Sequence, residues 1–288
     1  MNEYDPPIQA VRDAVARALS EDLGPLGDIT AALLPEGALG SATFVARAAG
    51  VLAGTACVEE TYAQLDDAVR VTWALGDGAT LETGALIGRL DGRLRSLLTG
   101  ERTALNFLCH LSGVATLTRR FVEAAARRAQ IWDTRKTLPG LRALQKAAVR
   151  AGGGANHRGS LSEMVLVKDN HLGSLGVTGA VKQARESWPG RRVEVECDHA
   201  DQVLEAVTAG ADMVMLDNMT PAEAADCVRL VREGTRPDTL VEVSGGITLE
   251  NVADYAGTGA DLISTSAITQ SAPALDIGLD VAPRANGP

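Results

Sequence analysis

Residues 193–244 read VEVECDHADQVLEAVTAGADMVMLDNMTPAEAADCVRLVREGTRPDTLVEVS, and this stretch decides the fold. Three short apolar runs alternate with two Ala-rich segments of helical spacing, the second of which begins with a Thr220-Pro-Ala-Glu capping box. Strands that alternate with helices at this spacing form βαβ units, in which the strands are parallel. The stretch therefore predicts a parallel sheet covered by helices.

The same alternation continues on both sides. Further apolar runs lie at 129–133, 164–168 and 262–266, and further helical segments lie at 177–187 and 249–256. This number of units favours closure into an α/β barrel, a fold whose chemistry lies at the C-terminal ends of its strands.

The first hundred residues differ. The runs 41–48, 69–75 and 85–98 are predicted strands separated by Gly and Asp turns, without a helix between each pair. We expect a separate α+β domain over residues 1–110, followed by the barrel domain over 111–270. Residues 99–128 have helical spacing and are read as a connecting helix, with a break at Gly113 left open. The apolar tail, within 271–288, is expected to return to the first domain.

The amino-acid composition argues against several classes of function. The formal net charge is −10, which argues against binding a nucleic-acid backbone. No apolar run approaches the roughly 18 residues of a membrane span, and the N-terminus lacks a signal-peptide pattern, so we expect a cytoplasmic protein. The four cysteines are far apart, which predicts reduced thiols and no structural metal.

The charge is unevenly distributed. Residues 133–171 carry seven Lys or Arg against three acids, a local charge of +4 within an acidic protein. Such an island is typical of a site for a small polyanionic ligand. For Arg142, Lys146 and Arg150, which are spaced four apart, the favoured interpretation is the solvated face of a helix.

Residue types at the predicted strand ends sort into three groups. Cations come first, at Arg135, Lys136 and Lys168, and suit planar carboxylates. Carboxylates follow at Glu196 and Asp217, and can bind ribose hydroxyls or Mg²⁺. The last two ends carry small residues, which let backbone N–H groups approach a phosphate. These are Ser244, Gly245, Gly246, Thr265 and Ser266.

Three motifs, DTRKTLPGLR (133–142), GGGANHR (152–158) and VKDNHL (167–172), closely resemble the quinolinate phosphoribosyltransferase family, and weaker matches cover nearly the whole chain. The resemblance implies an N-terminal α+β sandwich domain and an incomplete, open parallel α/β barrel. It also implies an enzyme that transfers phosphoribosyl from phosphoribosyl pyrophosphate to quinolinate with decarboxylation, giving nicotinate mononucleotide. The implied assembly is a homodimer in which Arg102 completes the partner's site, with a higher oligomer left open.

The resemblance also implies roles for individual residues. Lys136, Glu196 and Asp217 are the expected catalytic residues, with Lys136 as the candidate proton donor, and Glu196 and Asp217 as the expected Mg²⁺ site. The expected substrate-binding residues are Arg102, Thr134, Arg135, Lys136, His157, Arg158, Lys168, Glu196, Asp217, Ser244, Gly245, Gly246, Thr265, Ser266 and Ala267. One departure is Ser266, where the family usually has Gly, so a loop that needs a positive φ would be strained.

Two alternatives stay open. The first is a paralogue of the same fold that uses another nucleophile, such as the pyrophosphorylase-like proteins associated with molybdenum transport. The complete set of cations weighs against it. The second is a catalytically inactive phosphate or nucleotide sensor, which only Ser266 favours.

Overall fold

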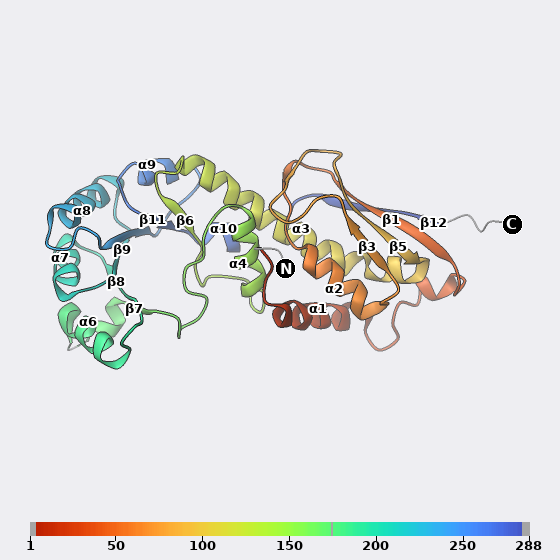
Figure 1. Ribbon diagram of the computed structural model, residues 1–288, viewed down its shortest axis with the longest axis horizontal. Coiled ribbons are helices and arrows are strands. Elements are labelled where there is room, and N and C mark those ends of the chain that lie inside the picture. Colours follow the sequence, from red (N-terminus) through yellow and green to blue (C-terminus); the bar gives the residue numbers. More distant parts are fainter. Residues whose placement is uncertain (1–3, 174, 284–288) are drawn as a thin grey trace. The chain divides into compact units, whose positions relative to one another are not determined.

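The computed structural model describes residues 4–173 and 175–283, which form two compact units. The first unit comprises the described residues of 1–119, 137–153 and 271–288, and the second comprises those of 120–136 and 154–270. Figure 1 labels most of the helices and strands of both units.

An antiparallel sheet is the basis of the first unit. In order across the sheet, its four strands among the described residues are β12 (Ile277–Pro283), β1 (Leu39–Ala46), β5 (Leu86–Arg93) and β3 (Arg70–Trp73). Two short strands, β2 (Gly50–Val51) and β4 (Thr80–Leu81), pair separately. The helices of this unit are α1 (Ile8–Leu23), the 3₁₀ turn η1 (Ala31–Leu33), α2 (Thr55–Leu65), α3 (Leu94–Ala125), which begins here, and α4 (Arg142–Ala151).

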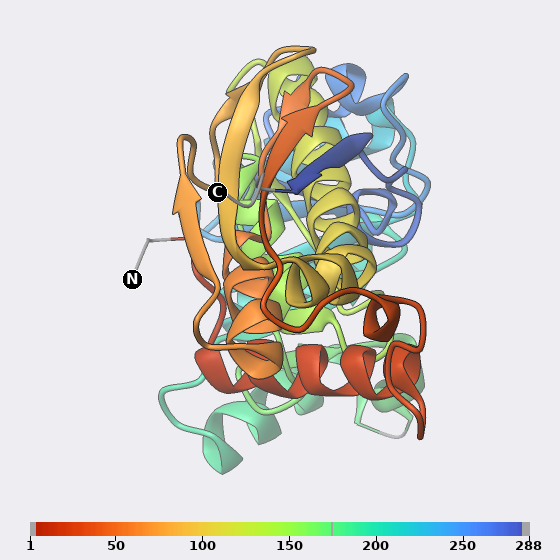
Figure 2. The same ribbon diagram turned by 90° about the vertical axis from the view of Figure 1, so that its right-hand side faces the viewer.

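The core of this unit lies between the sheet and its helices. Alternate residues of β1 are buried, as expected of a strand with one face on a core. Phe44 and Leu90 from the sheet share one apolar cluster with Tyr62 of α2 and with Leu97 and Leu108 of α3. Figure 2 views these strands and helices from the side of the first unit.

Two sequence-based expectations for this unit are wrong. Helix α2 lies between β2 and β3, where no helix was expected, and its buried face recurs at helical spacing through Cys57, Val58, Thr61 and Tyr62. The predicted strand at 85–98 is too long, because β5 ends at Arg93 and α3 begins at Leu94.

Gly113 does not interrupt helix α3, which runs continuously from Leu94 to Ala125. The residue is glycine for another reason. A Cβ at this position would lie 2.0 Å from the carbonyl oxygen of Pro273, so the tail passes directly against the helix backbone. Close approach, and not helix termination, therefore explains this glycine.

Helix α4 carries the three cations that were expected to form a solvated face. Only Arg142 is exposed, whereas Arg150 is half-buried and Lys146 is 6% exposed. The prediction of a helix is confirmed, but the prediction that its cationic face is solvated is wrong. Spacing alone could not show that this side of α4 is covered.

The second unit is an open, parallel α/β sheet, as expected. In order across the sheet, its strands among the described residues are β6 (Gln130–Trp132), β11 (Leu262–Ser264), β10 (Leu240–Ser244), β9 (Met213–Asp217), β8 (Val193–Cys197) and β7 (Val165–Val167). The helices are α5 (Asp169–Leu172), α6 (Gly176–Ser187), α7 (Ala200–Ala209), α8 (Pro221–Glu233), α9 (Val252–Ala256) and α10 (Ala267–Gln270). Figure 1 shows α6, α7 and α8 along the outer side of β7, β8 and β9.

Local sequence signals account for much of this unit. The predicted capping box begins α8: Glu223 accepts the backbone N–H of Thr220 at 2.8 Å, and Thr220 caps the N–H of Glu223. Strands β9 and β10 coincide with the second and third apolar runs of residues 193–244. No helix in the described part of the chain is both long and apolar enough to span a membrane.

Candidate active site

Parallel pairing brings the predicted strand-end residues to one edge of the sheet. Asp217 at the end of β9 lies beside Ser244 at the end of β10, and Glu196 of β8 lies beside Met215 of β9. Side chains at the C-terminal ends of neighbouring parallel strands can therefore face the same ligand.

A pocket of about 180 Å³ opens at this edge of the second unit. Nine of the expected substrate-binding residues line it: Thr134, Arg135, Lys136, His157, Arg158, Lys168, Glu196, Asp217 and Ser244. The lining also includes Leu166, Met215 and Ser264, which the sequence had not assigned to a site.

The loop that carries Arg135 and Lys136 is fixed by two hydrogen bonds. Thr134 Oγ1 accepts the backbone N–H of Lys136 at 3.0 Å, a local turn that serine and threonine commonly form. The carbonyl of Lys136 accepts the hydroxyl of Thr269 at 2.8 Å. The main chain at these two cations is therefore held by its own loop and by α10.

Cations and carboxylates meet within the pocket. The ammonium of Lys168 forms a short ion pair with Oε2 of Glu196, whose side chain is only 13% exposed. Burial lowers the pKa of Arg158, and the positive charge of Arg135 lowers it further. The two guanidinium groups thus lie close enough to repel each other, an arrangement that an anionic ligand would relieve.

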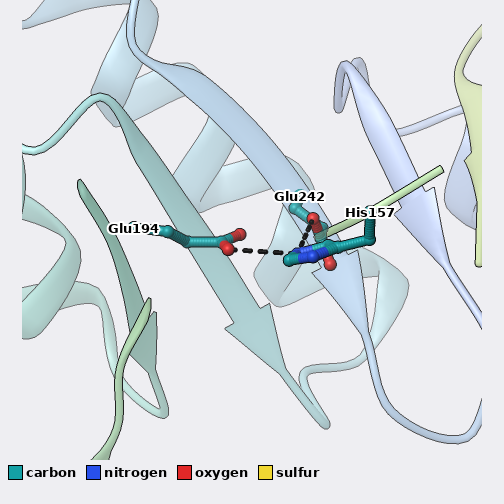
Figure 3. Close-up of side chains that lie close together, drawn as sticks. All are labelled: His157, Glu194 and Glu242. Atoms are coloured by element: carbon teal, nitrogen blue, oxygen red, sulfur yellow. Dashed lines mark hydrogen bonds and ion pairs between the residues drawn. The ribbon is translucent and has the colours of Figure 1, made fainter. Parts of the chain in front are cut away.

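His157 sits below the pocket rim with both ring nitrogens engaged. Its Nε2 lies 3.1 Å from Oε2 of Glu194 and 3.5 Å from Oε2 of Glu242, as Figure 3 shows. Its Nδ1 accepts the backbone N–H of Arg158 at 2.7 Å, and its backbone N–H donates to Asp133 at 3.0 Å. Any contact of this side chain with a ligand would therefore be made by ring carbons.

The charge state of this buried cluster follows from its hydrogen bonds. Burial lowers the pKa of His157, but Glu194 and Glu242 outweigh it and raise the pKa to about 9. Burial, and then the charge of Glu242, raise the pKa of Glu194 to about 7. Both glutamates face Nε2 and favour a proton on it, and the backbone N–H of Arg158 points at Nδ1.

The glycine loop after β10 needs glycine at both positions. Gly245 and Gly246 have φ values of +89° and +62°, in the left-handed region that favours glycine. A Cβ on Gly245 would also lie 2.2 Å from Oδ1 of Asn218. The loop backbone can therefore come close to its surroundings, as a phosphate site requires.

Gly245, Gly246, Thr265, Ser266 and Ala267 lie outside the lining of the 180 Å³ pocket. Thr265 nevertheless ties the end of β11 to the loop after β10, because its hydroxyl donates to the carbonyl of Ile247 at 3.1 Å. Ser266 is not among the described residues with a positive φ, so the strain considered for this departure from the family does not arise.

Arg102 belongs to the first unit, where it is exposed on α3. It lines a cavity of about 440 Å³ whose other polar walls include Arg47, Glu101 and Asp276. The second unit therefore does not contain this expected ligand-binding residue. The side chain of His171, in the Lys-Asp-Asn-His motif, lies outside the described residues.

Glu194 and Glu242 were not predicted as site residues. Each lies two positions before a pocket residue on the same strand, Glu196 on β8 and Ser244 on β10. Alternate residues of a strand share a face, so a Glu-x-Glu or Glu-x-Ser pattern in a buried strand could have revealed them.

Comparisons with known proteins find relatives over nearly the whole chain. The profiles of the quinolinate phosphoribosyl transferase N-terminal and C-terminal domains match residues 28–112 and 114–280. The chain is 43% identical to the nicotinate-nucleotide pyrophosphorylase [carboxylating] of Mycobacterium leprae, over 95% of this chain and 98% of that protein. It is 37% identical to a mitochondrial quinolinate phosphoribosyltransferase [decarboxylating] of Nicotiana tabacum, covering 96% of this chain and 83% of that protein.

Among solved structures, the nicotinate-nucleotide pyrophosphorylase from Francisella tularensis superposes with a TM-score of 0.91 at 37% identity, covering 98% of this chain and 99% of that chain. Family profiles, full-length relatives and fold thus agree over nearly all of the sequence. The chain belongs to the quinolinate phosphoribosyl transferase family.

Proposed function

We propose that this protein transfers the phosphoribosyl group of phosphoribosyl pyrophosphate to quinolinate and releases carbon dioxide and pyrophosphate, giving nicotinate mononucleotide. The observation that carries the proposal is the pocket itself. It is lined by the cations of residues 135, 136, 158 and 168 and by the carboxylates of residues 196 and 217, in a member of this family.

The cations of the pocket suit the two carboxylates of quinolinate. Arg135 and Arg158 can each form two parallel hydrogen bonds to a carboxylate, and Lys168 adds a point charge. A base with one carboxylate would bring less negative charge to this cationic, partly buried pocket, which costs binding free energy. The arrangement therefore favours quinolinate over pyridines with one carboxylate.

The carboxylates account for the ribose half of the site. Glu196 and Asp217 can accept hydrogen bonds from ribose hydroxyls and stabilise positive charge that develops at the anomeric carbon. We propose that they also hold Mg²⁺. Hard carboxylate oxygens are suitable ligands for this ion, which would neutralise the pyrophosphate leaving group when bound. The glycine loop at 245–246, with residues 265–267, is the proposed site for the 5′-phosphate.

Bond changes follow from the substrates. The bond between the anomeric carbon and pyrophosphate breaks, and the pyridine nitrogen donates its lone pair to that carbon. The bond from C2 to its carboxylate then breaks, releasing carbon dioxide and leaving an electron pair on C2 beside the positive nitrogen. A proton completes the product, and Lys136, which is exposed at the pocket, is the proposed donor. Orientation by the cations supplies much of the acceleration.

We further propose a homodimer in which Arg102 reaches the pocket of the partner subunit, with a higher oligomer as an extension. The exposure of Arg102 on α3, within a cavity that includes other charged residues, supports this arrangement. A cytoplasmic location is proposed as well, and the unpaired state of all four cysteines is consistent with a reducing compartment.

The decisive experiment follows quinolinate, carbon dioxide and pyrophosphate in one reaction with phosphoribosyl pyrophosphate and Mg²⁺. We expect equal molar release of both products, and kcat/KM for nicotinate lower by at least about 100-fold. Turnover of nicotinate at a comparable rate would instead indicate a paralogue with another nucleophile. Binding of phosphoribosyl pyrophosphate without product release would indicate an inactive sensor.

A further inference from the structure

Two buried carboxylates lie one inward-facing position deeper than the pocket. Glu194 precedes Glu196 by two residues on β8, and Glu242 precedes Ser244 by two residues on β10, so each shares its face with a pocket residue. Both glutamates are fully buried, and Figure 3 shows both side chains directed toward the ring of His157.

Burying these two carboxylates costs free energy. The interior of such a sheet is ordinarily filled by branched apolar side chains, and a buried carboxylate is tolerated only when it is paired. Among the described residues, Glu194 Oε1 forms no hydrogen bond, and Glu242 Oε2 has a long contact of 3.5 Å with Nε2 of His157. The partner that both carboxylates share is Nε2 of His157. Packing alone does not explain why this position needs two acids and an imidazole.

The imidazole ring of His157 connects the two glutamates to the backbone of the next residue, Arg158. With Nε2 held by the glutamates, Nδ1 is oriented to accept the backbone N–H of Arg158, at 2.7 Å. The backbone N–H of His157 is itself held by Asp133, a residue with no exposed surface. The main chain at Arg158 is therefore fixed from the interior, while Arg158 lines the pocket and its guanidinium donates to the carbonyl of Met164 at 3.3 Å.

We propose that Glu194 and Glu242 are positioning residues that act through His157 to hold Arg158 in the orientation that binds a carboxylate of quinolinate. The inference rests on the proposed function for the identity of the ligand. It assigns the two glutamates no contact with substrate. Glu242 also accepts the hydroxyl of Ser264, which lines the pocket, and a glutamine can keep that hydrogen bond. Replacing either glutamate by glutamine should therefore weaken one ligand selectively, through the placement of Arg158.

Glu194→Gln and Glu242→Gln test this, since glutamine keeps the shape of the side chain but removes the negative charge that holds Nε2 of His157. Displacing a substrate-positioning group by about 1 Å can cost up to about 100-fold. We expect the Kd for quinolinate, from calorimetry, to rise about 10- to 100-fold. The Kd for phosphoribosyl pyrophosphate and kcat at saturating quinolinate should change less than about 3-fold. Equal weakening of both ligands would overturn the proposal.

Val243→Ala is the matched control. Val243 is fully buried on the same strand as Glu242 but faces the opposite side of the sheet. We expect this variant to lower the melting temperature while leaving the Kd for quinolinate within about 2-fold of the wild type. If Val243→Ala weakened quinolinate as strongly as Glu242→Gln, general loosening of the sheet would explain both, and the positioning role would be wrong.

A double-mutant cycle tests the route through Arg158. If Glu194 acts by placing Arg158, then Glu194→Gln should have almost no further effect on the quinolinate Kd once Arg158→Ala has removed the guanidinium. We expect the double variant to lie within about 2-fold of Arg158→Ala. Effects that multiply across the two substitutions would show that Glu194 acts independently, and would overturn the inference.

A bound metal ion is the competing role for this cluster, because the ligand atoms of His157, Glu194 and Glu242 lie within 4.8 Å of one another. Elemental analysis of the wild type should find no stoichiometric transition metal. Such a metal, lost in Glu194→Gln, would replace the positioning role. Failure of the wild type to bind quinolinate would count against the proposed function, whereas normal binding by both glutamine variants would count only against this inference.

Discussion

Replacing Gly113 by alanine should destabilise the protein, although alanine is the better helix former. Gly113 lies within helix α3, and a Cβ there would be 2.0 Å from the carbonyl oxygen of Pro273 and 3.1 Å from Cα of Ala274. Both neighbours are backbone atoms, so no side-chain rotation can relieve the overlap. The tail that carries Pro273 must move away from the helix.

The expected loss of stability follows from the contacts that the tail around Leu275 would lose. A carbon to oxygen contact of about 3.3 Å requires a displacement of roughly 1.3 Å. The N–H of Leu275, two residues on, donates to the carbonyl of Cys109 at 2.9 Å, and its side chain is 7% exposed. Losing this hydrogen bond costs about 1 kcal/mol, and loosening the leucine costs about 1–3 kcal/mol more. Helix propensity returns about 1 kcal/mol, so the net loss is about 1–3 kcal/mol.

Thermal unfolding followed by circular dichroism measures the outcome. For a chain of this size, such a loss lowers the melting temperature by roughly 2–10 °C. Gly179→Ala is the matched control, because Gly179 also lies within a helix, α6, and its Cβ would meet nothing closer than Leu175 at 3.4 Å. That variant should melt at or above the wild-type temperature. If Gly113→Ala were as stable as Gly179→Ala, the close approach of the tail would be refuted.

Three further outcomes are expected. Arg102→Ala should lose quinolinate binding while the dimer persists, and mixing it with Lys136→Ala should restore activity in heterodimers; verified heterodimers without any recovery would exclude a shared site. Asp217→Asn should slow the chemical step about 100- to 1,000-fold in single-turnover experiments, with less than about a 3-fold change in the quinolinate Kd, and normal turnover at saturating Mg²⁺ would make this carboxylate structural. Burial raises the pKa of Cys197 to about 12, so at pH 8 this thiol should react with a disulfide reagent only after denaturation, and rapid labelling of the native protein would contradict its burial.

The sequence was most informative where local signals agreed with one another. The bounds of β9 and β10 and the capping box at Thr220 were predictable, because the apolar runs, the cap and the helical spacing all favour the same βαβ unit. Helix α2 was missed although its buried residues recur at helical spacing, because Gly and Asp turns on both sides favoured a meander of strands. Gly113 was ambiguous for a physical reason, since the segment that packs against it lies 160 residues later in the chain.

The residues that line the pocket could be predicted wherever the ends of the strands could be predicted. Residues at the ends of β8, β9 and β10 meet because parallel strands share a C-terminal edge, and this needs only the strand bounds. The burial of Lys146 was not predictable, because the spacing of three cations describes a helix face without showing what covers it. The pairing of Lys168 with Glu196 also needs three-dimensional placement, since the residues lie on different elements.

The alternation of strand residues explains how one sheet supplies both chemistry and support. On β8 and β10 the outer member of each inward-facing pair, Glu196 or Ser244, lines the pocket, whereas the inner member, Glu194 or Glu242, has no exposed surface. The outer residue can act on a ligand directly, and the inner one only by moving another side chain. The ion pair of Lys168 with Glu196 connects a cation proposed to bind quinolinate to a carboxylate proposed to bind the ribose. A substitution of Lys168 or Glu196 therefore changes the charge near both substrates. A substitution of Glu194 or Glu242 should change the binding of quinolinate alone.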